Sequence, residues 1–158
     1  MPQSQIAGGR AFTYLDNLGR IGVSSTAFWH PCALGRGKDD VLYVANWGNE
    51  FSSSTRITKC TLTTQEFLLD IGAPGSGDGE FLWPGGLVVD SKENLYVTDQ
   101  AISKVVIFTK DNEFVGKWGT KGSEPGQFHM PNGIALDQDD NYISRTAVIT
   151  GYSTTPRT

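Results

Sequence analysis

Short apolar runs separated by polar turns recur along the chain, and no segment shows helical periodicity. Residues 87–89 are apolar without interruption, as expected for a strand that is buried on both faces. A polar turn over 90–94 leads to a second apolar run at 95–97. Two further runs, at 104–109 and 113–118, are rich in β-branched and aromatic residues. This pattern predicts a unit of four short strands.

The unit repeats along the chain, and such a repeat fixes the fold class before any motif is interpreted. Five aromatic, glycine and proline positions recur at a constant shift: Phe67 and Phe114, Gly72 and Gly119, Gly79 and Gly126, Phe81 and Phe128, and Pro84 and Pro131. A fainter earlier copy runs through Tyr14 and Pro31 and carries an insertion around residues 51–54. Repeats of roughly 40 to 50 residues built from short strands are typical of β-propeller blades.

Residues 77–90, 94–99 and 104–108 resemble the NHL-repeat family of β-propellers, with Ile102 and Lys104 in the places of the family's Asn and Arg. The resemblance extends over residues 11–144. It implies an all-β fold in which blades of four antiparallel strands stack face to face. Because this fold hosts many unrelated functions, the resemblance alone implies no particular activity.

The repeats divide the chain into an N-terminal tail over 1–10, a partial NHL-type propeller over 11–144 and an irregular C-terminal tail over 145–158. Within the propeller we expect an outer strand at 11–18, one blade at 28–71, a second at 81–118 and a partial third at 128–144. Since propellers usually contain about 4 to 8 blades, this count predicts an incomplete, open propeller.

The third copy departs from the repeat near its end. We interpret Tyr142 as the counterpart of Tyr96, with one residue lost after Asn141, which puts Arg145 where Asp99 predicts an acid. Two explanations stay open. The chain is a fragment whose end is altered by a change of reading frame, or it is a short protein that completes its ring by oligomerising. In both cases we expect a partner protein or self-association, because an incomplete propeller leaves a sheet face bare.

Composition narrows the class of partner. A net charge of -4 and an isoelectric point near 5.1 leave no basic field for phosphates, which disfavours nucleic acid. The N-terminal residues have no signal-peptide pattern and no segment is long enough to span a membrane, so we expect a cytoplasmic protein without a membrane partner. Cys32 and Cys60 fall on the first and third strands of one blade, too far apart for a disulfide.

Two motifs suggest metal binding, and both have simpler explanations. Asp137, Asp139 and Asn141 have the D-x-D-x-N spacing of a calcium loop, but the glycine and the glutamate of such a loop are missing. They fit a turn between two strands better. The two histidines, His30 and His129, occupy offset positions in the repeat. We therefore predict neither a metal site nor a cofactor.

The resemblance also brings an enzymatic alternative. Propeller enzymes of this type, the peptidylglycine amidating lyases and the gluconolactonase-like hydrolases, place histidines or carboxylates just after the repeat's proline. The matching positions here are Cys32, Gly85 and Asn132, which do not supply such a set. We predict no catalytic residues in this chain, and the enzyme alternative would need catalytic groups in further blades.

The preferred hypothesis is a non-catalytic scaffold that binds a protein or another extended ligand. The insertion after Trp47 lengthens the loop between the second and third strands, and in propellers this loop shares a face with the Gly-rich links between blades. The loop could equally cover the outer edge of its blade. The candidate ligand face comprises six residues: His30, Cys32, Trp47, Phe51, Trp83 and Asn132.

Overall fold

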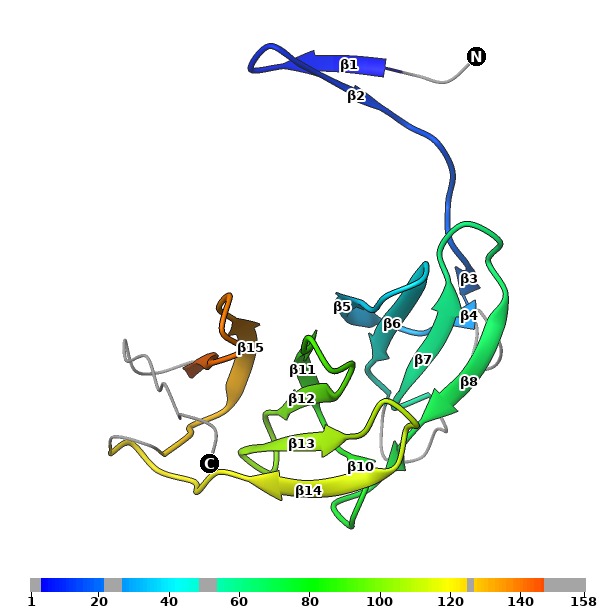
Figure 1. Ribbon diagram of the computed structural model, residues 1–158. Coiled ribbons are helices and arrows are strands. Elements are labelled where there is room, and N and C mark those ends of the chain that lie inside the picture. Colours follow the sequence, from blue (N-terminus) through cyan, green and yellow to red (C-terminus); the bar gives the residue numbers. More distant parts are fainter. Residues whose placement is uncertain (1–3, 22–26, 49–53, 125–126, 147–158) are drawn as a thin grey trace.

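The computed structural model describes residues 4–21, 27–48, 54–124 and 127–146. These residues form strands, turns and loops without a helix, which confirms the predicted all-β class. Two complete four-stranded sheets and a two-stranded third sheet follow one another in an open arc (Figure 1). No helix in these ranges is long and apolar enough to cross a membrane.

All pairing within the three blades is antiparallel between strands that are consecutive in the sequence. Blade 1 contains β5 (Pro31–Arg36), β6 (Val41–Asn46), β7 (Arg56–Thr61) and β8 (Phe67–Ile71). Blade 2 contains β11 (Pro84–Val89), β12 (Leu95–Asp99), β13 (Lys104–Phe108) and β14 (Phe114–Trp118). The partial blade 3 contains β15 (Pro131–Leu136) and β16 (Tyr142–Thr146).

A short parallel pair, β9 (Ala73–Pro74) with β10 (Glu80–Phe81), links blade 1 to blade 2, and a similar pair, β3 (Arg20–Ile21) with β4 (Ala27–Phe28), precedes blade 1. Phe81 is fully buried beside Gly72, and Phe128 is buried beside Gly119 in the same way. Both glycines have positive φ values, of 77° and 116°, and a Cβ atom at either position would overlap the neighbouring phenylalanine ring. The recurring Gly and Phe of the sequence therefore form one packing unit.

Apolar residues are buried between neighbouring blades. The first interface joins Tyr43 and Ile57 of blade 1 to Leu87 and Val97 of blade 2. The second contains Tyr96, Val105, Phe128 and Tyr142, and the rings of Tyr96 and Tyr142 lie 4.6 Å apart. The uninterrupted apolar run at 87–89 is explained by this stacking, since a central blade has a neighbour on each face.

The pairing of β15 with β16 corrects the interpretation of the third copy. Leu136 pairs with Tyr142 as Val89 pairs with Leu95, so Tyr142 takes the place of Leu95 and no residue is lost. Thr146, rather than Arg145, stands at the Asp99 position, because it pairs with Pro131 as Asp99 pairs with Pro84. Tyr96 and Tyr142 are the same residue type but do not occupy equivalent positions. The register of paired strands is fixed by the turn and by the pattern of buried positions, not by the similarity of single residues.

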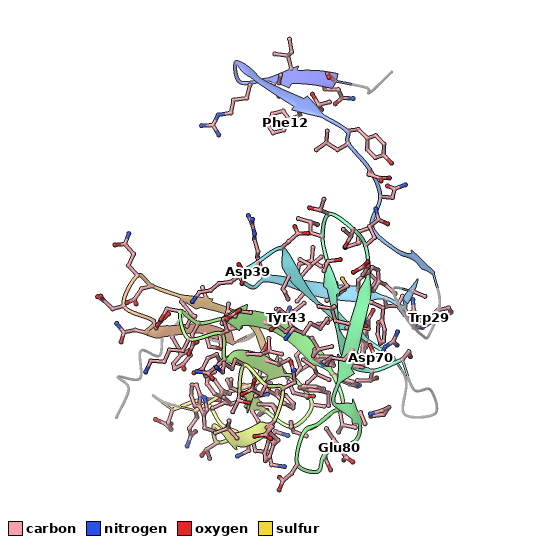
Figure 2. The ribbon with its side chains drawn as sticks, turned by 45° about the vertical axis from the view of Figure 1, so that its right-hand side comes forward. Phe12, Trp29, Asp39, Tyr43, Asp70 and Glu80 are labelled. Carbon is pink, nitrogen blue, oxygen red and sulfur yellow. The ribbon has the colours of Figure 1, made fainter. Side chains whose placement is uncertain are left out.

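The N-terminal region also differs from expectation. In place of a single strand at 11–18 after an irregular tail, β1 (Ser4–Ala7) and β2 (Arg10–Thr13) form a hairpin. Gly8 and Gly9 both have positive φ, as a two-residue hairpin turn requires. Figure 2 shows the hairpin, with Phe12 labelled, well separated from the blades. With no outer-strand partner beside it, the segment pairs with itself.

Asp90 and Asp137 organise the turns between the first two strands of their blades. Asp137 accepts hydrogen bonds from the backbone of Asp139 and from the backbone and side chain of Asn141. The turn interpretation of the D-x-D-x-N motif is thereby confirmed. Asp90 accepts the equivalent three bonds and a fourth from the hydroxyl of Tyr96, at 3.0 Å.

Replacing Phe81 tests its place in the core. Phe81→Ala leaves a cavity between blades 1 and 2, and we expect it to lower the free energy of unfolding by about 3 to 5 kcal/mol in chemical denaturation. Val115→Ala on the outer strand β14 is the control, since Val115 is 59% exposed. An unfolding midpoint for Phe81→Ala equal to that of the control would contradict the assignment.

Asp90 should make stability depend on pH. Burial raises its pKa, but the hydrogen bonds from Asn94, Tyr96 and Lys92 outweigh burial and hold the pKa below the usual aspartate value. A lowered pKa in the folded state gives stability that is present above the unfolded pKa of about 3.9 and lost as the pH falls through the folded value.

We expect Asp90→Asn to cost about 1.5 to 3 kcal/mol of unfolding free energy at pH 7, because hydrogen bonds to a charged acceptor are lost. The free energy of unfolding of Asp90→Asn should also fall less steeply than that of the wild type as the pH is lowered below about 5. Denaturation curves measured from pH 3 to pH 7 check both effects. Asp139→Asn, on the exposed turn of blade 3, is the control. If the unfolding free energy of Asp90→Asn fell with decreasing pH as steeply as that of the wild type, the assignment would be wrong.

Candidate functional site

One rim of the arc is formed by residues just before each inner strand and just after each second strand. In blade 1 the backbone N–H of Trp47 donates to the carbonyl of His30 at 3.1 Å. In blade 2 the N–H of Gln100 donates to the carbonyl of Trp83 at 2.9 Å. The same bond thus fixes the same loop to the same strand in both blades, so the rim repeats with the fold.

A buried carboxylate holds the rim of blade 2. Asp99, at the end of β12, is fully buried and accepts hydrogen bonds from the backbone N–H groups of Leu82 and Trp83 at 2.7 and 3.0 Å. It also accepts from Ala101 and Ile102 at 2.9 and 3.2 Å. Four bonds to one carboxylate fix the segment before β11 and the loop after β12 to each other.

Asn46 has the matching place in blade 1 and makes fewer contacts with the rim. Its side-chain oxygen accepts from the N–H of Trp29 at 3.2 Å. Its amide group donates inward, to the carbonyl of Val44 and the hydroxyl of Thr58, both at 3.1 Å. An amide divides its bonds between rim and sheet, whereas the carboxylate of Asp99 can only accept.

Two exposed tryptophans from neighbouring blades meet on this rim. The rings of Trp47 and Trp83 lie 6.2 Å apart in an edge-to-face arrangement, with planes at 72°. Their exposed fractions are 46% and 44%. They border the first cleft, of about 420 Å³, which is lined by Trp47, Gly48, Thr55, Pro74, Phe81, Leu82, Trp83 and Ala101.

A second cleft of about 270 Å³ adjoins the first and shares Trp83 and Ala101 with it. The remaining lining residues are mostly polar: Gln100, Ser103, Lys121, His129 and Met130. Nδ1 of His129 is buried and has no hydrogen-bond partner among the described residues. The second cleft therefore adds polar and charged side chains on the other side of the wall that it shares with the first.

The six candidate residues of the sequence have different positions in the structure. Trp47 and Trp83 come together, and Asn132 lies beside the second cleft, where its side-chain oxygen accepts from Gln100 at 3.4 Å. His30 packs against Trp29, labelled in Figure 2, with ring centroids 5.2 Å apart. Phe51 lies outside the described residues.

Cys32 lies on β5 and lines neither of the two clefts. Its thiol donates to the carbonyls of Pro84 at 3.1 Å and of Ala45 at 3.4 Å. Burial of the thiol raises its pKa to about 11, which disfavours the nucleophilic thiolate at neutral pH. Cys60 on β7 is buried, and both cysteines are free, as predicted.

Sequence reasoning missed Gln100 and Lys121. Gln100 could have been found, since it is the counterpart of Trp47 one blade later and both follow the second strand of their blade. Lys121 belongs to a link between blades and has no motif around it. In the described ranges, no three His, Cys, Asp or Glu side chains form a group that could hold a metal.

Comparisons with known proteins agree with this architecture. A family described as a 6-bladed beta-propeller matches residues 85–150. Protein lin-41 of Caenorhabditis elegans, an NHL-repeat protein, is 42% identical over 50 residues. That match covers 32% of this chain and 4% of lin-41, so the chain spans a small part of the relative's length.

Solved structures show the same fold at low sequence identity. A putative exported protein from Bacteroides fragilis matches with a TM-score of 0.59 and 16% identity, over 89% of this chain and 41% of that protein. A gluconolactonase from Xanthomonas campestris matches with a TM-score of 0.54 and 16% identity, over 76% of this chain and 36% of the enzyme. Together with the sheets described above, these matches show that the described part of the chain is an open, partial β-propeller.

Proposed function

We propose that this propeller segment is a non-catalytic scaffold that binds an extended protein segment across the rim formed by Trp47 and Trp83. The observation that carries the proposal is the meeting of two exposed tryptophans from neighbouring blades over a cleft. Large aromatic side chains on a protein surface are the residues that most often dominate binding energy at interfaces. A cleft that continues into a second one suits a ligand longer than a small molecule.

The rim is also organised before any ligand arrives. The bonds from Leu82, Trp83, Ala101 and Ile102 to Asp99 order the wall between the two clefts. A rigid wall reduces the entropy that binding would otherwise cost. The arrangement therefore favours recognition by a surface that changes little on binding.

The enzyme alternative, a lyase or lactonase, has weaker support. The gluconolactonase shares the fold, but at 16% identity this likeness carries no activity over to the chain. The positions just after the prolines are Cys32, Gly85 and Asn132, and the Cys32 thiol is committed to backbone carbonyls. The binding proposal uses residues that the structure brings together.

A selection from a displayed library of random heptapeptides tests the binding site. Peptides enriched on the wild-type protein should bind the double variant Trp47→Ser and Trp83→Ser at least about tenfold more weakly, since an aromatic anchor at an interface is often worth more than 1.4 kcal/mol. Fluorescence anisotropy of the labelled peptides gives the affinities.

Val115→Ser is the matched control, because it removes an apolar side chain of similar exposure from the outer strand β14. Its affinity for the selected peptides should equal that of the wild type. Selection that yields no binders, or binders indifferent to the tryptophans, would contradict the proposal.

A second contact surface follows from the open end of the arc at blade 1. Leu34 on β5 is 65% exposed, whereas its counterpart Leu87 on β11 is 5% exposed because blade 1 covers it. Beside Leu34 lies an apolar hollow of about 640 Å³ whose walls include Phe28, Leu42 and Leu62. We propose that a second copy of the chain covers this face, because exposed apolar patches of this kind drive association.

Size-exclusion chromatography with light scattering should therefore show a species larger than the monomer whose share grows with protein concentration. Leu34→Glu should shift the equilibrium towards monomer, since a charge would be buried in the contact. Val115→Glu, which places the same charge on the outer strand, should leave the distribution unchanged. A monodisperse wild-type monomer at all concentrations would refute self-association.

A further inference from the structure

The first cleft is suited to an apolar side chain. Its walls are the two tryptophans with Pro74, Phe81 and Leu82, and Thr55 has the one hydroxyl group among its lining side chains. The hydroxyl of Thr55 already accepts a bond from the N–H of Gly48 at 3.0 Å. An apolar group in this cleft would be removed from water against mainly apolar walls.

The second cleft is suited to an anion. Lys121 lines it, and no acidic side chain does. The neighbouring lysines are already in use: Lys104 donates to the carbonyl of Gly119, and Lys117 pairs with Asp78 at 3.3 Å. Lys121 has neither an ion pair nor a side-chain hydrogen bond within the part of the chain that the structure describes. Lys121 is exposed to solvent and is paired with no acidic side chain in the described residues, so its charge is available to a ligand at the edge of this cleft.

The histidine beside Lys121 gives an independent indication. Nδ1 of His129 is buried without a partner in the described ranges, and a proton there would be a buried, unsatisfied donor. This favours the tautomer that carries its proton on Nε2, so the ring offers a donor on its other edge. The second N–H of the Gln100 amide, whose first N–H donates to Asn132, and the hydroxyl of Ser103 are further donors at the second cleft that match an acceptor group.

The two clefts share Trp83 and Ala101 as a common wall. In an extended peptide, residues two apart lie on the same face and are separated by about 7 Å, a span that suits two compartments divided by one side chain. Resting on the proposed function, we propose that the rim recognises an extended peptide with an apolar side chain in the first cleft and, two residues away, an Asp or Glu side chain beside Lys121.

The charges favour a carboxylate over a phosphate. Phosphate groups are usually bound by several cations or by bidentate arginine, whereas this cleft holds a single lysine. Nucleic acid would need a stripe of basic residues, and the chain has a net charge of -4. A single carboxylate is the anion that one lysine and a few neutral donors can satisfy.

Four labelled heptapeptides test the pattern by fluorescence anisotropy. The parent is Ser-Thr-Leu-Thr-Glu-Thr-Ser, and its matched partners carry Gln for Glu, Ser for Leu, or Leu and Glu side by side. We expect the parent to bind best and the Gln peptide about fivefold more weakly, as for a partly exposed charge pair. The Ser peptide should lose more, because it lacks the apolar anchor.

Reversing the charge of the protein gives the sharper test. Lys121→Glu should weaken binding of the parent peptide and bind a peptide with Lys in place of Glu better than the wild type does. Lys110→Glu, on the exposed turn between β13 and β14, makes the same change of net charge away from the clefts and should alter neither affinity. Lys121→Gln removes the charge without reversing it. If its melting temperature equals that of the wild type, weaker binding of the parent peptide reflects loss of the charge rather than loss of the fold.

Equal binding of the Glu and Gln peptides, or no effect of Lys121→Glu beyond that of Lys110→Glu, would overturn the inference. Tighter binding of a labelled single-stranded RNA of seven nucleotides than of the parent peptide would overturn it too. If library peptides depend on the tryptophans but show no acidic preference, this inference fails and the proposed function stands. If no peptide depends on the tryptophans, both fail.

Discussion

The structure depends on the burial of apolar sheet faces between neighbouring blades. A single blade is too thin to form a core of its own, so its apolar side chains are covered only when another blade lies against them. Blade 2 meets this requirement, with Leu87 and Val97 packed on one face and Tyr96 and Val105 on the other. The uninterrupted apolar runs and the tight links both serve this stacking.

The links carry the same constraint into the sequence. Phe81 and Phe128 close the space between blades, and they can lie there only because Gly72 and Gly119 have no side chain. The chain must also turn through a left-handed conformation at both glycines. This explains why the repeat is clearest at its glycines and aromatics and faint where strands merely require apolar residues.

How much could be predicted from the sequence follows from this physics. The blades, the burial of Phe81 and the turn role of Asp137 were predictable, because each depends on residues that recur in register. The place of Tyr142 was not, since Tyr96 and Tyr142 look alike in an alignment but stand one position apart in the second strands of their blades, and so on opposite faces. The clefts were only partly predictable. Trp47 and Trp83 could be singled out from the sequence because they are aromatic. Lys121 could not, because its proposed role depends on its having no acidic partner in the folded structure.

The unequal anchoring of the two tryptophans has a mechanical consequence. Trp83 is fixed through its own N–H to a carboxylate that gathers four backbone donors. Trp47 is tied to the frame by one backbone bond to His30, and Asn46 holds only Trp29 on that side. One side of the cleft between them is therefore held by several hydrogen bonds, and the other side by fewer. To fit ligands of different size, the Trp47 side would shift, while the firmly held Trp83 ring would determine how the ligand is oriented.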